Sequence, residues 1–185
     1  AQANYSSSYG TLANASGLAS MAFGAGANAS ETGAIAHGVN SIASGANSST
    51  FGTASTATKE DAIAFGYSAA ASGVDAIAIG KSSVASEANS TVIGTEAKAT
   101  KVNSSAFGDA AEASGNQSTA FGAGSAATQE NATAIGEKAK ASGTQSTAIG
   151  RQALANRHDA TALGTVSKAT NARSTAIGVL TKASG

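Results

Sequence analysis

Large apolar side chains recur in this chain every 14 residues, and each one directly precedes a glycine. Counted from that glycine as position 0 of a coil, position 13 holds Phe, Ile, Leu or Tyr, with His37 as the exception. The glycines keep the same interval thirteen times, at Gly10, Gly24, Gly38, Gly52, Gly66, Gly80, Gly94, Gly108, Gly122, Gly136, Gly150, Gly164 and Gly178. A fixed short period is the signature of a solenoid, in which each repeat is one coil stacked on the last. We therefore expect one array of coils from near residue 4 onward.

Small residues mark a second pattern within each coil. Position 5 is Ala in all thirteen repeats, position 10 is always Ala or Ser, and positions 3 and 12 are Ala or Ser with few exceptions. Two short runs of alternation with period two indicate two strands in each coil. The inner faces of both strands then line a lumen that admits only Ala or Ser. Such a narrow lumen predicts two closely packed sheets, in other words a flattened parallel β-roll.

The turns between the strands have their own residues. The repeat glycine fits a sharp turn after the second strand, because a residue without a Cβ adopts positive φ at no steric cost. A second glycine, at position 7 in six coils, marks the other turn. Position 9 is mostly Asn, Asp or Gln. We expect these side chains to bond to their own turn backbone or to stack as a ladder.

Position 13 lies on the face of its strand opposite to the lumen, because side chains alternate along a strand. The largest hydrophobic residues are therefore predicted to lie outside the roll, where they form an apolar stripe. Burying each such side chain contributes roughly 1.5–3 kcal/mol to stability. A lumen that admits only Ala and Ser has no room for these side chains, so they can be buried only against another surface. We expect the stripe to face other copies of the same chain. The expected interface consists of Phe23, Ile35, His37, Phe51, Phe65, Ile79, Ile93, Phe107, Phe121, Ile135, Ile149, Leu163 and Ile177.

Composition narrows the functional classes. Leu, Ile, Val and Phe make up only 26 of 185 residues, but 11 basic and 11 acidic residues cancel, so the high net charge typical of disordered chains is missing. The absence of Cys excludes disulfides and cysteine zinc sites. Residues 1–92 carry five acids and two bases, whereas residues 93–185 carry six acids and nine bases. This weak charge asymmetry is much smaller than the basic stripe expected of a nucleic-acid-binding protein. The sequence also contains no run of 18 apolar residues, so we do not expect this segment to insert into a membrane.

Nothing in the pattern points to an enzyme, a metal site or a cofactor. His37 and His158 are too distant in the array to form a nucleophile–base pair, and Asp61 and Asp75 are best explained as solvated turn residues. Gly-X-Gly segments at residues 24–26 and 122–124 match the outline of a dinucleotide fingerprint. That fingerprint requires a helix after the glycines, so we interpret them as turn glycines.

The repeat reads Asn-Ser-Thr-Val-Ile-Gly at 89–94, Gln-Ser-Thr-Ala-Ile-Gly at 145–150 and Asn-Ser-Ser-Ala-Phe-Gly at 103–108. These segments resemble the head repeats of trimeric autotransporter adhesins, the YadA-like head, over essentially all of residues 4–185. The resemblance implies an all-β, left-handed parallel β-roll with 14-residue coils, assembled as a homotrimer. It also implies residence on a bacterial cell surface, with outer-membrane anchoring through a C-terminal region that this sequence lacks. Residues 1–9 are then a lead-in and partial first coil, and residues 10–185 are head repeats cut from a longer chain.

The expected function is that of an adhesin head that contributes to virulence by attaching to host matrix or to cell-surface receptors, and to autoagglutination. The partner implied by the resemblance is collagen-like, fibronectin-like or a cell-adhesion receptor. Two alternatives stay open. One is an ice-binding solenoid, suggested by a regular row of Thr at position 11 of the later coils; the other is a purely structural spacer. The ice-binding alternative needs the Thr row exposed on a monomer.

A partner must use surfaces that neither the lumen nor the stripe occupies. The outward positions 2 and 4 are mostly small and polar, but some are apolar or basic. Weak contacts at these positions gain strength when a three-fold assembly repeats them. The candidate ligand surface consists of Ile42, Val84, Lys98, Lys138, Lys140, Leu154 and Lys168.

Overall fold

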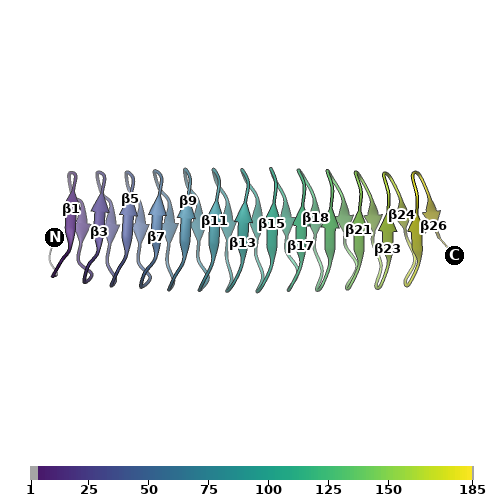
Figure 1. Ribbon diagram of the computed structural model, residues 1–185, viewed down its shortest axis with the longest axis horizontal. Helices are drawn as coiled ribbons and strands as arrows, with labels where there is room; N and C mark the ends of the chain where they lie inside the picture. Colours follow the sequence, from purple (N-terminus) through teal and green to yellow (C-terminus); the bar gives the residue numbers. More distant parts are fainter. Residues whose placement is uncertain (1–3, 185) are drawn as a thin grey trace. The chain divides into compact units, whose positions relative to one another are not determined.

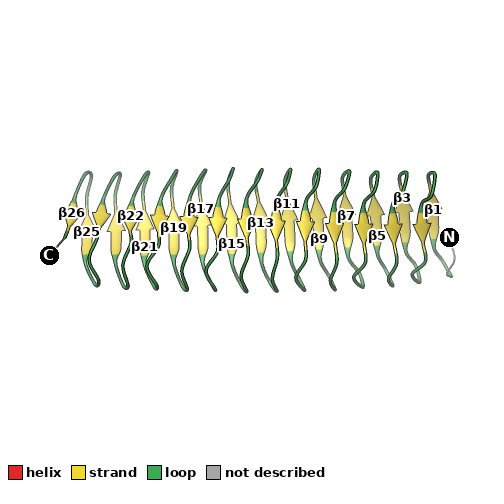
Figure 2. Cartoon of the chain, turned by 180° about the vertical axis from the view of Figure 1, so that it is seen from behind, coloured by secondary structure: helices red, strands yellow, loops and turns green. Residues whose placement is uncertain are grey.

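A computed structural model describes residues 4–184. The chain divides into two compact units, Ala1–Thr95 and Glu96–Gly185. Within each unit, successive coils stack in the same orientation (Figures 1 and 2), and the described residues form strands and turns with no helix. The predicted all-β parallel solenoid is confirmed, with two strands in each 14-residue coil.

The strand before each repeat glycine spans positions 11–13, and these strands pair in parallel as the first sheet of each unit. In the first unit they are β1 (Ser7–Tyr9), β3 (Met21–Phe23), β5 (Ile35–His37), β7 (Ser49–Phe51), β9 (Ile63–Phe65), β11 (Ile77–Ile79) and β13 (Thr91–Ile93). In the second unit they are β15 (Ser105–Phe107), β17 (Thr119–Phe121), β19 (Thr133–Ile135), β21 (Thr147–Ile149), β23 (Thr161–Leu163) and β25 (Thr175–Ile177).

The return strand of each coil spans positions 4 and 5, and these strands form the second sheet of each unit. In the first unit they are β2 (Asn14–Ala15), β4 (Asn28–Ala29), β6 (Ile42–Ala43), β8 (Thr56–Ala57), β10 (Ala70–Ala71) and β12 (Val84–Ala85). In the second unit they are β14 (Lys98–Ala99), β16 (Glu112–Ala113), β18 (Ala126–Ala127), β20 (Lys140–Ala141), β22 (Leu154–Ala155), β24 (Lys168–Ala169) and β26 (Lys182–Ala183).

Register along both sheets is a shift of one repeat. Ile77 pairs with Ile63 on one side and with Thr91 on the other, so equivalent positions of successive coils lie side by side. The side chains of one position therefore form a row along each unit, separated by the strand spacing of about 4.8 Å.

The lumen is built as predicted. Its buried side chains are Ala and Ser at positions 3, 5, 10 and 12, and the largest fully buried ones are Val92 and Thr50. Except for Ser20, a buried Ser at position 10 donates to the carbonyl at position 7 of the same coil, as Ser118 does to Gly115 over 2.6 Å. Except for Ser125, a buried Ser at position 3 donates to the carbonyl of the repeat glycine, as Ser83 does to Gly80 over 2.9 Å. Serine therefore fits the lumen because its hydroxyl closes a turn.

Each turn has a left-handed residue that the sequence analysis did not identify. Positions 2 and 9 have positive φ throughout, with values between 51° and 60° at the residues other than glycine. The preference for Asn and Asp at position 9 follows from this backbone conformation, which these residues tolerate best. The expected position-9 ladder is absent among residues 4–184. An amide pair instead occurs at position 4, where Asn14 Nδ2 donates to Asn28 Oδ1 over 3.1 Å.

The repeat glycine is required for two reasons. Its φ lies between 119° and 151°, a range that L side chains rarely adopt, as expected. A Cβ at this position also meets backbone atoms of the next coil, at 2.6 Å from both the carbonyl carbon and oxygen of Gly136 when it is built on Gly122. Among residues 4–184, the glycines at position 7 lack positive φ, but a Cβ there meets the position-7 carbonyl of the next coil, as for Gly45 against Lys59. Close stacking of coils, more than the turn itself, accounts for glycine at position 7.

The two glycines of one turn provide a matched test of this packing. Gly122→Ala combines a disfavoured φ with a backbone collision, so we expect it to lower the free energy of unfolding by about 3 kcal/mol. Gly124→Ala is the control, because its φ is 62° and its nearest neighbour is Lys138 Cγ at 3.5 Å. We expect about 1 kcal/mol or less for this control. Thermal unfolding followed by circular dichroism measures both, and equal losses would contradict the packing argument.

Two buried serines test the role of the lumen hydroxyls. Ser118 Oγ donates to the carbonyl of Gly115 and accepts from its amide at 3.2 Å, so Ser118→Ala should destabilise the protein by about 1 kcal/mol. Ser125 Oγ is equally buried but has no hydrogen-bond partner. Ser125→Ala should therefore leave the melting temperature unchanged or raise it. A larger loss at Ser125 than at Ser118 would show that the hydroxyls do not act in this way.

Candidate interaction surfaces

The outer face of the first sheet carries the predicted apolar stripe. The position-13 side chains point away from the lumen, and Phe121 and Ile177 are 56% and 65% exposed. Others, such as Ile79, Phe107 and Ile149, are half-buried by their neighbours in the row. Within the first unit the row consists of Tyr9, Phe23, His37, Phe51, Phe65, Ile79 and Ile93. Within the second unit it consists of Phe107, Phe121, Ile135, Ile149, Leu163 and Ile177.

Rings of neighbouring coils contact one another along this row. The ring centroids of Phe23 and His37 are 6.0 Å apart, those of His37 and Phe51 are 5.4 Å apart, and those of Phe51 and Phe65 are 5.9 Å apart. In the second unit the Phe107 and Phe121 rings are separated by 5.8 Å. These spacings are those of favourable aromatic pairs. His37 therefore lies within an aromatic ladder, between two phenylalanines, although it is the polar member of the row.

Position 11 flanks the ladder on the same face and changes character along the chain. In the first unit it holds four apolar residues, Met21, Ile35, Ile63 and Ile77, together with Ser7, Ser49 and Thr91, whereas it is Thr in most coils of the second unit. In the first unit, Met21, Ile35 and three members of the ladder line an apolar hollow of about 290 Å³. In the second unit the Thr side chains are half-buried from β17 to β23. They lie beside Phe, Ile and Leu, so the Thr row has no second row of hydroxyls next to it.

The outer face of the second sheet carries most of the predicted ligand surface. Ile42, Val84, Lys98, Lys140, Leu154 and Lys168 all occupy position 4, where side chains point away from the lumen. The lysines and Ile42 are exposed, whereas Val84 and Leu154 are half-buried. Lys138 differs from the rest because it lies in the turn before β20, with φ of 55°, and its Nζ lies 3.6 Å from Glu137 Oε1.

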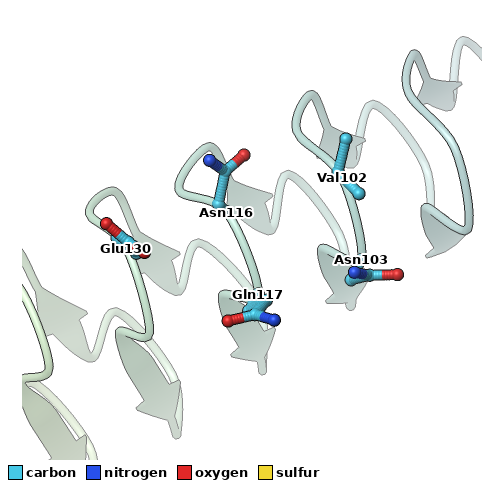
Figure 3. A pocket seen from close by; sticks show the side chains of 5 residues that line it. All are labelled: Val102, Asn103, Asn116, Gln117 and Glu130. Atoms are coloured by element: carbon cyan, nitrogen blue, oxygen red, sulfur yellow. The ribbon is translucent and has the colours of Figure 1, made fainter.

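A polar hollow in the second unit was not predicted. It measures about 240 Å³ and is lined by Val102, Asn103, Asn116, Gln117 and Glu130 (Figure 3). These residues occupy positions 8 and 9 of three successive coils. The available signal in the sequence was the presence of polar residues at position 8, such as Asn116 and Glu130. The residue type at position 8 varies too much from coil to coil for this signal to stand out.

The glycine-rich segments are turns, as expected. Gly26 and Gly124 have φ of 68° and 62° and belong to turns between strands. Within residues 4–184, no group of three or more His, Asp or Glu side chains is arranged to hold a metal ion. The described part of the chain also contains no helix of sufficient length and apolarity to cross a membrane.

Comparison with known proteins gives a family. A family model described as YadA head domain repeat (2 copies) matches residues 15–41, 36–58, 43–69, 57–81, 71–97, 99–125, 127–153 and 155–181. No curated protein matches the chain. The crystal structure of the collagen-binding domain of Yersinia adhesin YadA is similar at 25% sequence identity, over 93% of this chain and 69% of that one. Its TM-score of 0.33 is too low for that likeness to support an argument.

The family model covers most of the chain in segments that follow the stacked coils, in agreement with the resemblance seen in the hexapeptides. The chain therefore belongs to the YadA head domain family, a family of adhesin-type domains.

Proposed function

We propose that this chain is the head of a bacterial surface adhesin that works as a homotrimer and attaches cells to host extracellular matrix or to a cell-surface receptor. Membership of the adhesin-domain family is the observation that carries the proposal. The apolar first-sheet faces meet in the trimer, and the second-sheet faces point outward to the partner. Anchoring in the outer membrane through a further region of the protein, a role in virulence and autoagglutination all belong to the same proposal.

The trimer is supported by the exposure of the stripe. Phe65, Phe121 and Ile177 are all more than half exposed on a single chain, next to further Phe and Ile side chains of the same row. Contiguous apolar surfaces of this kind mark interaction sites in soluble proteins. Covering each side chain contributes roughly 1.5–3 kcal/mol, so even the six coils of the second unit supply a substantial driving force for assembly. Every coil repeats the same positions, so identical chains can pair in register.

Charge at two stacked phenylalanines tests the trimer. Phe107→Asp with Phe121→Asp places unpaired carboxylates in the proposed interface, and we expect the trimer to dissociate or the chain to unfold. The control is Ala110→Asp with Ala123→Asp, two exposed residues in the turns that follow β15 and β17, which should leave assembly unchanged. Size-exclusion chromatography with light scattering measures the mass of both proteins. A soluble trimer from the Phe variant would refute the assignment of this face.

The assignment of the partner surface is supported by the fact that the second-sheet face and the turns are the surfaces not used by the lumen or the proposed trimer. The lumen is filled by Ala and Ser, and the first-sheet face is assigned to the trimer, which leaves the second-sheet face and the turns. That face combines half-buried aliphatic side chains, at Val84 and Leu154, with exposed lysines. An extended host protein of the collagen-like or fibronectin-like class suits weak contacts that recur from coil to coil. Three copies of the row raise the overall affinity through avidity.

Two sets of substitutions test this surface. Glu in place of Lys138, Lys140 and Lys168 reverses three positive charges, and Val84→Asp with Leu154→Asp removes two aliphatic contacts. We expect each set to weaken adhesion to immobilised collagen or fibronectin by roughly tenfold, because the effect repeats on three chains. Assembly should be unchanged in light scattering. If both variants still adhere as well as the unmodified protein, the second-sheet assignment is wrong. If the unmodified protein itself does not bind collagen or fibronectin, the head is a spacer.

A further inference from the structure

The positive charge of the second unit is concentrated in its last coils. Residues 137–185 contain seven basic residues and two acidic ones, a difference of +5, whereas residues 96–136 contain two basic and four acidic ones, a difference of −2. Both acids of the basic segment already lie beside a basic side chain. Glu137 lies 3.6 Å from Lys138, and Asp159 lies 3.0 Å from His158 Nε2. The other bases of the segment are Lys140, Arg151, Arg157, Lys168, Arg173 and Lys182.

Three of these bases form a straight row on the second sheet. Lys140 on β20 pairs with Leu154 on β22, which pairs with Lys168 on β24, which pairs with Lys182 on β26. Adjacent strands are about 4.8 Å apart, so Lys168 and Lys182 are separated by one strand spacing, whereas Lys140 and Lys168 are separated by two, with Leu154 between them. Lys168 and Lys182 therefore lie directly opposite each other, an arrangement that destabilises a sheet through like-charge repulsion. Among residues 4–184 no carboxylate lies within ion-pair distance of any of the three lysines.

The chemistry of this row selects one class of ligand. Position 6 of the coils that carry Lys140, Leu154 and Lys168 holds Ser142, Asn156 and Thr170, all half-buried. The Thr170 hydroxyl is already bonded to the Ala183 carbonyl, so the lysines are the main groups that this face offers to a ligand. Residues 137–185 contain no Phe, Tyr or Trp, so the segment lacks the stacking platforms on which single-stranded nucleic acids depend. A row of exposed lysines without carboxylate partners instead matches a linear polymer that carries anionic groups at intervals along its length.

We propose that the row Lys140, Lys168 and Lys182 binds a linear sulfated polysaccharide of the glycosaminoglycan class. The sulfate groups pair with these lysines, which have no carboxylate partner among residues 4–184, and so reduce the repulsion between Lys168 and Lys182. Binding is salt-dependent, because exposed charges are screened beyond about 8 Å at physiological ionic strength. The inference rests on the proposed function in one respect: the second-sheet face must point outward in the trimer.

Heparin is the probe that tests the proposal, with fully desulfated heparin and dextran as reference polymers. Binding of the intact protein is measured by surface plasmon resonance at low and physiological ionic strength. We expect affinity for heparin that falls as salt increases, and little binding of either reference polymer. Lys140→Gln with Lys168→Gln and Lys182→Gln should weaken heparin binding by roughly tenfold or more, since three contacts are lost from each chain.

The matched control removes three exposed lysines elsewhere, in Lys59→Gln with Lys81→Gln and Lys101→Gln, and should change heparin binding less than about twofold if position rather than net charge decides. Equal weakening by both triple variants would overturn the proposal. So would equal binding of desulfated heparin, or equally lysine-dependent binding of an oligonucleotide or of phosphatidylserine vesicles. Light scattering and collagen binding are recorded on the same samples. If the protein is a trimer that binds collagen but not heparin, only this inference is wrong. If heparin binding depends on the lysines but no trimer is found, only the proposed assembly is wrong.

Discussion

The lumen of each coil admits only small side chains, and this restriction determines where the other residues lie. Position 12 shows it most clearly, because it is Ala in nearly every coil, and Thr50 and Val92 are the largest side chains that are fully buried. A chain with so little internal volume cannot bury Phe or Ile within itself. Its large hydrophobic residues must point outward, and most of them do so from the first sheet, at positions 11 and 13. The exposed stripe is therefore a consequence of the narrow lumen, and a need for a covering partner follows from it.

Stability in such a roll comes mainly from the stacking of coils. Each coil hydrogen-bonds to its neighbours through parallel ladders, and equivalent residues lie in register one repeat apart. The repeat glycine permits this close stacking, since its missing Cβ leaves room for the carbonyl of the next coil. The lumen hydroxyls add a second contribution, because each gives a turn carbonyl a hydrogen bond in addition to the one from the backbone amide, as at Gly80 and Gly115. The left-handed backbone conformation of residues in every coil lowers the stability, most of all at bulky residues such as Leu12 and Val166.

The sequence was sufficient to predict the lumen and the stripe, because both are strict. Ala at position 5 and the large apolar residue at position 13 hardly vary, and alternation along a strand converts that regularity into inner and outer faces. The left-handed backbone at position 2 was not predicted, because residues as different as Leu12, Ala54 and Lys138 occupy it. Its conformation is imposed by the stacked strands on either side, and residue preference hardly contributes. The hollow near Val102 was missed for a related reason: it is formed by side chains of three coils, none of which has a distinctive residue by itself.

The two sheets of a coil are bonded alike but differ in what their outer faces present. The first sheet presents the aromatic and aliphatic ladder, whose neighbouring rings are already in contact with one another, as Phe107 and Phe121 are at 5.8 Å. Such a face gains most from an identical ladder, because pairing repeats the same favourable contact at every coil. The second sheet presents position 4, which changes from coil to coil between Asn, Ile, Thr, Ala, Val, Glu, Leu and Lys. The lumen does not constrain this face and the proposed trimer does not use it, so its residues are free to vary in this way. The variable face is therefore where differences in charge and shape between coils can be used to recognise a partner.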